Sequence, residues 1–155
     1  MSDCTTAAGR IEVLLVEDNA TDAELALRAL HRRHPARAIV HVQDGAEALA
    51  FLRGEGCFVG RDANQLPKVI LLDLKLPKLT GLEVLRAIKS DPLLRVIPVV
   101  MLTSSCQERD LAAAYRLGAN SYIVKPVEFD SFSEAVAQLG VYWLLLNQPP
   151  ALAEK

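Results

Sequence analysis

Five polar residues each follow the end of a short apolar run: Glu17, Asp18, Asp73, Thr103 and Lys125. Three of them are carboxylates, which repel one another if the fold brings them together and stay ionised only beside a cation. Oxygen ligands with open positions suit Mg²⁺. A single carboxylate at a strand end is commonly just solvated, but three carboxylates with a lysine are unusual and indicate a site.

The apolar runs themselves predict the elements that position these residues. They are Val13–Val16, Ala38–Val42, Val69–Leu72, Ile97–Leu102 and Tyr122–Val124, and they are rich in Val, Ile and Leu. Continuous rather than alternating apolar runs are typical of strands that are buried on both faces, as in parallel sheets.

Helical patterns separate the runs. Three pairs have the three-residue spacing of a helix start, and they are Thr21 with Glu24, Asp44 with Glu47, and Thr80 with Glu83. A fourth helix is expected over residues 107–117, with Gly118 as its left-handed cap. The fifth is expected to bury one stripe, made of Phe129, Phe132, Val136, Leu139 and Trp143.

Five strand–helix repeats predict an α/β fold with right-handed crossovers, a parallel sheet and helices on both faces. We expect a doubly wound, flavodoxin-like, five-stranded parallel sheet with strand order 2-1-3-4-5. Sites in such sheets form at the carboxyl ends of the strands, where the strand order reverses. Here the reversal lies between the first and third strands, which places Glu17, Asp18 and Asp73 side by side.

Composition limits the classes of function. The 155 residues fit one domain, with residues 1–10 as a flexible N-terminus, 11–140 as the domain and 141–155 as an extension of the last helix with a mobile end. A net charge of −2 without a basic stripe argues against nucleic-acid binding. No apolar run is long enough to cross a bilayer and no signal pattern opens the chain, so we expect a cytoplasmic protein without a membrane partner.

Several segments in order resemble the receiver domain of two-component response regulators. They are Val16-Glu17-Asp18-Asn19, Leu71-Leu72-Asp73-Leu74-Lys75-Leu76-Pro77, Gly81, Pro98-Val99-Val100-Met101-Leu102-Thr103-Ser104 and Lys125-Pro126. The resemblance runs from Ile11 to about Leu139. It implies a phosphorylated signalling switch, not an enzyme, that acts with a sensor histidine kinase.

The resemblance also implies roles for individual residues. Asp73 would be the phosphoacceptor, with Thr103 and Lys125 bound to phosphoryl oxygens. The implied Mg²⁺ ligands are Asp18, Asp73 and the backbone carbonyl of Lys75, with Glu17 acting mainly through bound water. Thr103 and Tyr122 would form the switch, and Pro126 would follow a cis bond that aims Lys125 into the site. An ordinary half-buried strand tyrosine is an equal alternative for Tyr122.

The long loop 54–67 and the aromatic tail Tyr142-Trp143-Leu144 are similar to the stand-alone regulators that partner bacterial phytochrome kinases. The apolar tail also predicts a homodimer through the fourth helix, fifth strand, fifth helix and tail, because a monomer would leave Tyr142, Leu144 and Leu145 partly wet. The tail folding back over its own domain is the alternative.

Other functions remain open at this point. With few residues after the last helix, output is expected through protein binding or through drainage of phosphate from a kinase. A pseudo-receiver that only assembles complexes is a further alternative. Such a protein would not need Asp18, Asp73, Thr103 and Lys125, so the presence of all four argues against it. A metal-dependent phosphatase with an aspartyl-phosphate intermediate is disfavoured, because Asp73 is followed by Leu74 and Lys75 with no general acid.

Overall fold

The computed structural model describes residues 11–35, 38–126 and 128–150. Its five strands are all parallel and lie in the predicted order β2-β1-β3-β4-β5. They are β1 (Val13–Val16), β2 (Ile39–Val42), β3 (Val69–Leu72), β4 (Val99–Thr103) and β5 (Ser121–Val124). The predicted doubly wound fold is confirmed, with β1 and β3 side by side at the sheet centre.

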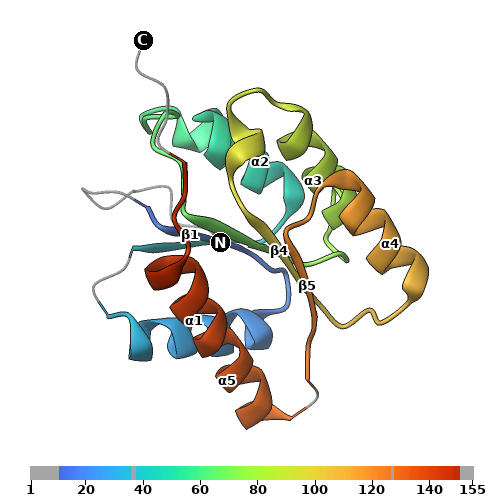
Figure 1. Ribbon diagram of the computed structural model, residues 1–155. Coiled ribbons are helices and arrows are strands. Elements are labelled where there is room, and N and C mark those ends of the chain that lie inside the picture. The colour runs from blue at the N-terminus through green and yellow to red at the C-terminus, as the bar shows by residue number, and fades with distance from the viewer. Residues whose placement is uncertain (1–10, 36–37, 127, 151–155) are drawn as a thin grey trace.

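Five α-helices connect the strands and cover both faces of the sheet. They are α1 (Ala20–Arg33), α2 (Gly45–Arg53), α3 (Gly81–Ser90), α4 (Glu108–Leu117) and α5 (Phe129–Gly140). Helices α1 and α5 lie on one face, and α2, α3 and α4 lie on the other (Figure 1). No helix of the described ranges is long and apolar enough to span a membrane.

The core is divided in two by the sheet. Leu14, Ile70 and Met101 point toward α2, α3 and α4, whereas Val13 and Val100 point toward α1 and α5. Both sets are buried, which explains why the central strands β1 and β3 are apolar at every position. Each fully buried side chain of this size contributes roughly 1.5–3 kcal/mol relative to an exposed one. The sheet is therefore a rigid platform whose strand ends carry the polar residues.

Two of the three expected helix starts are confirmed. Thr80 and Glu83 form a complete capping box at α3, and the Asp44 side chain accepts a hydrogen bond from the Glu47 N–H at α2. The expectation for α1 is wrong, because Asn19 caps this helix. Its Oδ1 accepts a hydrogen bond of 2.9 Å from the Asp22 N–H, so the helix starts at Ala20, directly after the short segment that carries Glu17 and Asp18.

The end of the fifth helix differs from the expected stripe. Phe129 is 61% exposed and Leu144 is only 2% exposed, so the expectation of a buried Phe129 and an outward Leu144 is wrong. After Gly140 the chain continues as a π-helical segment, Val141–Leu146. Hydrogen bonds to the fifth residue back shift the positions that face the core relative to an α-helical stripe. Tyr142 remains exposed, as expected.

The loop between α2 and β3 is held by its own contacts. The Phe58 ring packs edge-on against Phe51 with centroids 5.2 Å apart. The Arg61 guanidinium lies 4.1 Å from the Phe51 ring centroid and donates a hydrogen bond of 3.0 Å to the Phe51 carbonyl. A cation over a ring face is attracted by the ring quadrupole. The extra length of this loop is thus folded against α2.

Candidate functional site

The three predicted carboxylates lie together. Parallel pairing of Val16 with Leu72 brings the ends of β1 and β3 to the same edge of the sheet. One carboxylate oxygen from each of Glu17, Asp18 and Asp73 lies within 4.8 Å of the others. Asp18 is exposed, whereas Glu17 and Asp73 are buried. The set consists of hard oxygen donors with one side open to solvent, which fits a divalent cation such as Mg²⁺ or Mn²⁺.

The Lys125 ammonium lies inside this group. Its Nζ is 2.6 Å from Glu17 Oε1, 3.0 Å from Asp22 Oδ2 and 3.1 Å from Asp73 Oδ2, and the lysine side chain is only 8% exposed. The Lys125 backbone N–H donates a hydrogen bond of 2.7 Å to the Thr103 carbonyl, which continues the pairing of β4 with β5. Lys125 therefore balances the carboxylates from a fixed position at the end of β5.

Burial controls the charge states in this cluster. Burial raises the pKa of Glu17 to about 7, although the hydrogen bond from Lys125 opposes the rise. Burial lowers the pKa of Lys125, but its bonds to Glu17 and Asp22 and the charge of Asp73 outweigh this and hold the pKa above its usual value. A contact of 2.6 Å between Lys125 and Glu17 favours the charged form of both groups. Even with Lys125 beside it, Glu17 is therefore partly protonated at neutral pH, and a bound metal cation would favour its ionised form.

The two predicted switch residues contact the same neighbour. Thr103, fully buried at the end of β4, accepts a hydrogen bond of 3.2 Å on its Oγ1 from the Ser105 N–H. The Tyr122 hydroxyl donates a hydrogen bond of 2.9 Å to the Ser105 carbonyl. The loop that follows β4 is therefore tied both to the buried threonine and to the tyrosine of β5.

Two further expectations concern the Lys125–Pro126 peptide bond and the backbone carbonyl of Lys75. The Lys125–Pro126 bond is trans, as are the other peptide bonds among the described residues, so the expectation of a cis bond is wrong. Lys125 is aimed into the site by the pairing of β5 with β4. Lys75 is exposed in the turn after β3, and the ligand role of its backbone carbonyl stays a prediction.

Two polar contacts of the cluster were not predicted from the sequence. Asp22 binds Lys125, and His41 Nε2 lies 2.7 Å from the Glu17 carbonyl oxygen. Asp22 could have been predicted. It lies three residues after Asn19, the N-cap, and therefore in the first turn of a helix that starts at the site. His41 gave no comparable signal, since it lies within β2 and only the pairing of β2 with β1 brings it to Glu17.

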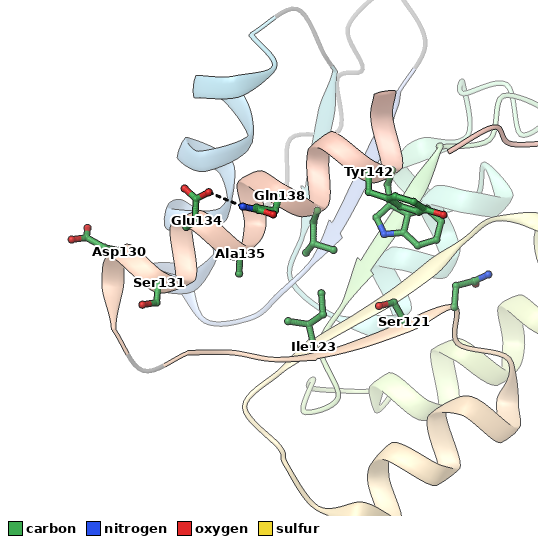
Figure 2. A pocket seen from close by; sticks show the side chains of 11 residues that line it. Ser121, Ile123, Asp130, Ser131, Glu134, Ala135, Gln138 and Tyr142 are labelled. Carbon is green, nitrogen blue, oxygen red and sulfur yellow. Dashed lines mark hydrogen bonds between the residues drawn. The ribbon is translucent and has the colours of Figure 1, made fainter. Parts of the chain in front are cut away.

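A groove of about 920 Å³ lies away from the acidic cluster, between β5 and α5. Ser121 and Ile123 of β5 form one wall, and α5 forms the other, as Figure 2 shows. Tyr142 and Trp143 lie at its end, with ring centroids 4.8 Å apart and an interplanar angle of 85°. The groove thus joins an apolar aromatic end to a polar end on α5.

A central parallel sheet with three carboxylates, a threonine and a lysine at its carboxyl edge defines the class of this protein. The family model of the response regulator receiver domain matches residues 13–137. The chain therefore belongs to the receiver-domain family of two-component response regulators. Receiver domains bind divalent metal at this acidic pocket and interact with histidine kinases.

The chain is similar over most of its length to three known proteins, two of them solved response regulators. The solved bacteriophytochrome response regulator RtBRR is 52% identical, with a TM-score of 0.72 over 92% of this chain and 85% of that chain. The Mn²⁺-bound form of response regulator Rcp1 is 36% identical, with a TM-score of 0.84 over 92% of this chain and 100% of that chain. The probable methanogenesis regulatory protein FilR2 of Methanothrix harundinacea is 43% identical over 142 residues, 91% of this chain and 88% of that protein.

Proposed function

We propose that this chain is a single-domain response regulator that accepts a phosphoryl group on Asp73 from a sensor histidine kinase and signals through a change of shape. The observation that carries the proposal is the position of Asp73. Its Oδ2 lies 3.1 Å from Lys125 Nζ, and its carboxylate is grouped with those of Glu17 and Asp18. A buried carboxylate beside a fixed cation and a metal-binding pair is suited to phosphoryl transfer, which depends on positioning and charge neutralisation.

In the transfer step, an Asp73 carboxylate oxygen attacks phosphorus and forms an O–P bond. The P–N bond to the kinase histidine breaks, and its electron pair returns to the imidazole. Asp18, Asp73 and the Lys75 carbonyl would hold Mg²⁺ directly, with Glu17 acting through water. When bound, the cation neutralises charge on the phosphoryl oxygens. Lys125 neutralises charge from the other side, and the Leu74 N–H donates a hydrogen bond of 2.7 Å that orients the Asp73 carboxylate.

The switch would run through the residue that two side chains share. The Thr103 oxygen accepts from the Ser105 N–H, so the hydroxyl could donate its proton to a phosphoryl oxygen, and a shift of Thr103 toward that oxygen would pull on Ser105. Because Tyr122 is bound to the Ser105 carbonyl, a movement of this loop changes the position of the tyrosine. The signal would then leave the site along β5 and α4.

The partner proposed for the phosphoryl donor is a bacteriophytochrome-type kinase in the cytoplasm. This is supported by the identity to RtBRR, whereas the similarity to FilR2 fits a different input.

The aromatic end of the β5–α5 groove, together with exposed Tyr142, Leu145 and Leu146, supports a homodimer through α4, β5, α5 and the tail. Residues 11–140 would form the receiver unit, with 141–150 continuing α5; the expected ends 1–10 and 151–155 lie outside the described residues.

Labelling tests the assignment of Asp73. The protein is incubated with acetyl phosphate and Mg²⁺, and the adduct is mapped by mass spectrometry, with Asp73→Asn as the test variant. Asp62→Asn, an exposed aspartate of the loop before β3, is the matched control. We expect one phosphoryl group on the wild type and the control and none on Asp73→Asn. Labelling of Asp73→Asn to the wild-type level would refute the proposal. If the wild type is not labelled, a protein that only assembles complexes would be favoured instead.

A further inference from the structure

We propose that Asp22 is a positioning residue for Lys125, which holds the ammonium beside the phosphoacceptor when a divalent cation occupies the other carboxylates. This rests on the proposed function, because it assigns a role in the reaction of Asp73.

The starting point is the number of partners of the lysine. An ammonium has three N–H donors. Lys125 Nζ has three carboxylate partners, Glu17 at 2.6 Å, Asp22 at 3.0 Å and Asp73 at 3.1 Å. Every donor of the buried ammonium is therefore used without metal, and two of the three acceptors belong to the acidic cluster that a divalent cation binds.

Asp22 differs from the other two partners in its place. Its carboxylate is not part of the group formed by Glu17, Asp18 and Asp73, and its side chain is 32% exposed. It belongs to the first turn of α1, where its own N–H is fixed by the Asn19 cap. The positive end of the helix dipole stabilises a carboxylate at this position. Asp22 is thus a fixed anion at the edge of the metal-binding group.

Occupation of the site by a cation changes the balance around the lysine. Glu17 and Asp73 would help to hold the cation, directly or through water, and the positive charge of the cation would weaken their attraction for the ammonium. Asp22 then remains as the protein anion that holds Lys125 within reach of the phosphoryl group. Without Asp22 the ammonium would stay on Glu17 and Asp73 and compete with the cation, and at saturating cation it would be displaced and move away from the phosphoacceptor.

The test combines Asp22→Asn with Lys125→Ala in a double-mutant cycle. The first readout is Mg²⁺ affinity of the unphosphorylated protein by calorimetry, and the second is the rate of Asp73 labelling by acetyl phosphate at saturating Mg²⁺. In labelling, the Asp73 oxygen forms its bond to phosphorus while the bond to the bridging oxygen breaks and acetate leaves with that electron pair. Glu24→Gln is the matched control, since this exposed acid of the same helix pairs with Arg28.

We expect Asp22→Asn to weaken Mg²⁺ binding and to slow labelling by roughly three- to tenfold each, which lies in the lower part of the range of coupling between contacting residues. In the Lys125→Ala background the same substitution should change either quantity by less than about twofold, because the residue through which it acts is gone. Asp22→Glu, which restores a carboxylate in the first turn of α1, should recover most of both losses, and the Lys125→Ala background separates the contact with Lys125 from a purely structural role in the helix start.

Three results would overturn the inference. They are an Asp22→Asn protein that matches Glu24→Gln in both readouts, an equal loss in the Lys125→Ala background, and no recovery by Asp22→Glu. If Asp22→Asn does not fold, Asp22→Ser takes its place in the cycle, since serine also tolerates the start of a helix. A wild type that is not labelled refutes the proposed function itself, and the calorimetric arm then still decides whether Asp22 acts through Lys125.

Discussion

Lys125 Nζ lies 3.1 Å from Asp73 Oδ2, although β5 and β3 are separated by the whole of β4. The lysine crosses the end of the strand that carries Thr103 and places its charge at the carboxylate proposed to accept the phosphoryl group. Asp73 and the ammonium beside it thus belong to different elements, so any movement of one relative to the other changes the charge balance of the site.

Lys125→Ala should leave the fold intact in the presence of Mg²⁺ and remove the link between phosphorylation and shape change. The lysine is a point charge that can follow an added phosphoryl oxygen. Hydrogen exchange of α4 and β5 amides, before and after labelling, measures the change. Lys78→Ala, which removes an exposed partner of Asp44, is the control. A phosphorylated Lys125→Ala protein with the wild-type exchange pattern would show that another residue senses the phosphoryl group.

Asp18→Asn should weaken Mg²⁺ binding by at least about tenfold, since loss of outer-shell partners alone has effects of this size. Asp18 is exposed, so the substitution should leave the thermal unfolding temperature unchanged. Calorimetric titration gives the affinity, with Asp62→Asn as the control. Equal affinity of Asp18→Asn and wild type would mean that Asp18 is not a ligand.

Mg²⁺ affinity should depend on pH through Glu17. Burial raises the pKa of this carboxyl to about 7, and a cation favours its ionised form. Affinity should therefore increase as pH rises from 5 toward 7, by up to about tenfold per unit for one displaced proton, and level off above 7. Glu17→Gln should remove this slope. A wild-type affinity that is flat between pH 5 and 7 would contradict the prediction.

The same pKa predicts how stability changes with pH in metal-free protein. The folded Glu17 binds its proton up to about pH 7, whereas the ordinary value is 4.5. The folded state therefore holds more protons in this window, and the free energy of unfolding should fall as pH rises from about 4.5 to 7. Urea unfolding across this range measures the slope, with Glu17→Gln again as the reference that lacks it.

Gly81→Ala should lower both stability and labelling, because a side chain at this position has no room. A Cβ there would press on the Asp73 carbonyl oxygen and lie 2.7 Å from Leu74 Cα. Overpacking of this kind costs roughly 1–3 kcal/mol, and the displaced atoms belong to the backbone of Asp73, the proposed phosphoacceptor, and of Leu74. Gly60→Ala, with open space around its Cβ, is the matched control. Normal labelling of Gly81→Ala would show that the Asp73 backbone tolerates the shift.

Tyr142→Ser and Leu145→Ser should shift a dimer toward monomer, because both side chains are exposed at the tail. Val59→Ser, which removes a 76% exposed apolar residue elsewhere, should leave the association unchanged. Light scattering at tens of micromolar gives the mass. Truncation at Gly140 is a poorer test, since it would delete the buried Leu144. A monomeric wild type, with and without phosphorylation, would refute the proposed dimer.

Much of the fold and of the site could be predicted because the signals are local. Apolar runs buried on both faces gave the parallel sheet, and residues directly after β1 and β3 had to meet where these strands pair. The contact of Asp22 with Lys125 could not be predicted in the same way. It depends on the start of α1 at Asn19, and a nearby Thr21–Glu24 pair offered a competing start.

The tail shows a second kind of failure. The expected stripe assumed 3.6 residues per turn through Trp143, but the chain changes to π-helical hydrogen bonds after Gly140. Leu144 then turns into the core, and Trp143 is only partly covered. The change to π-helical hydrogen bonds accompanies the packing of Leu144 in the core, and no local residue pattern predicts it.

The buried charges at the carboxyl edge of the sheet also have an evolutionary consequence. Glu17, Asp73 and Lys125 are each nearly removed from water, and well-packed apolar side chains in place of such groups are often neutral or stabilising. A descendant released from signalling could therefore lose these three residues together and gain stability, whereas loss of Lys125 alone would leave the carboxylates unbalanced. On the proposed function, selection for signalling would maintain the full set in a fold that could tolerate its absence.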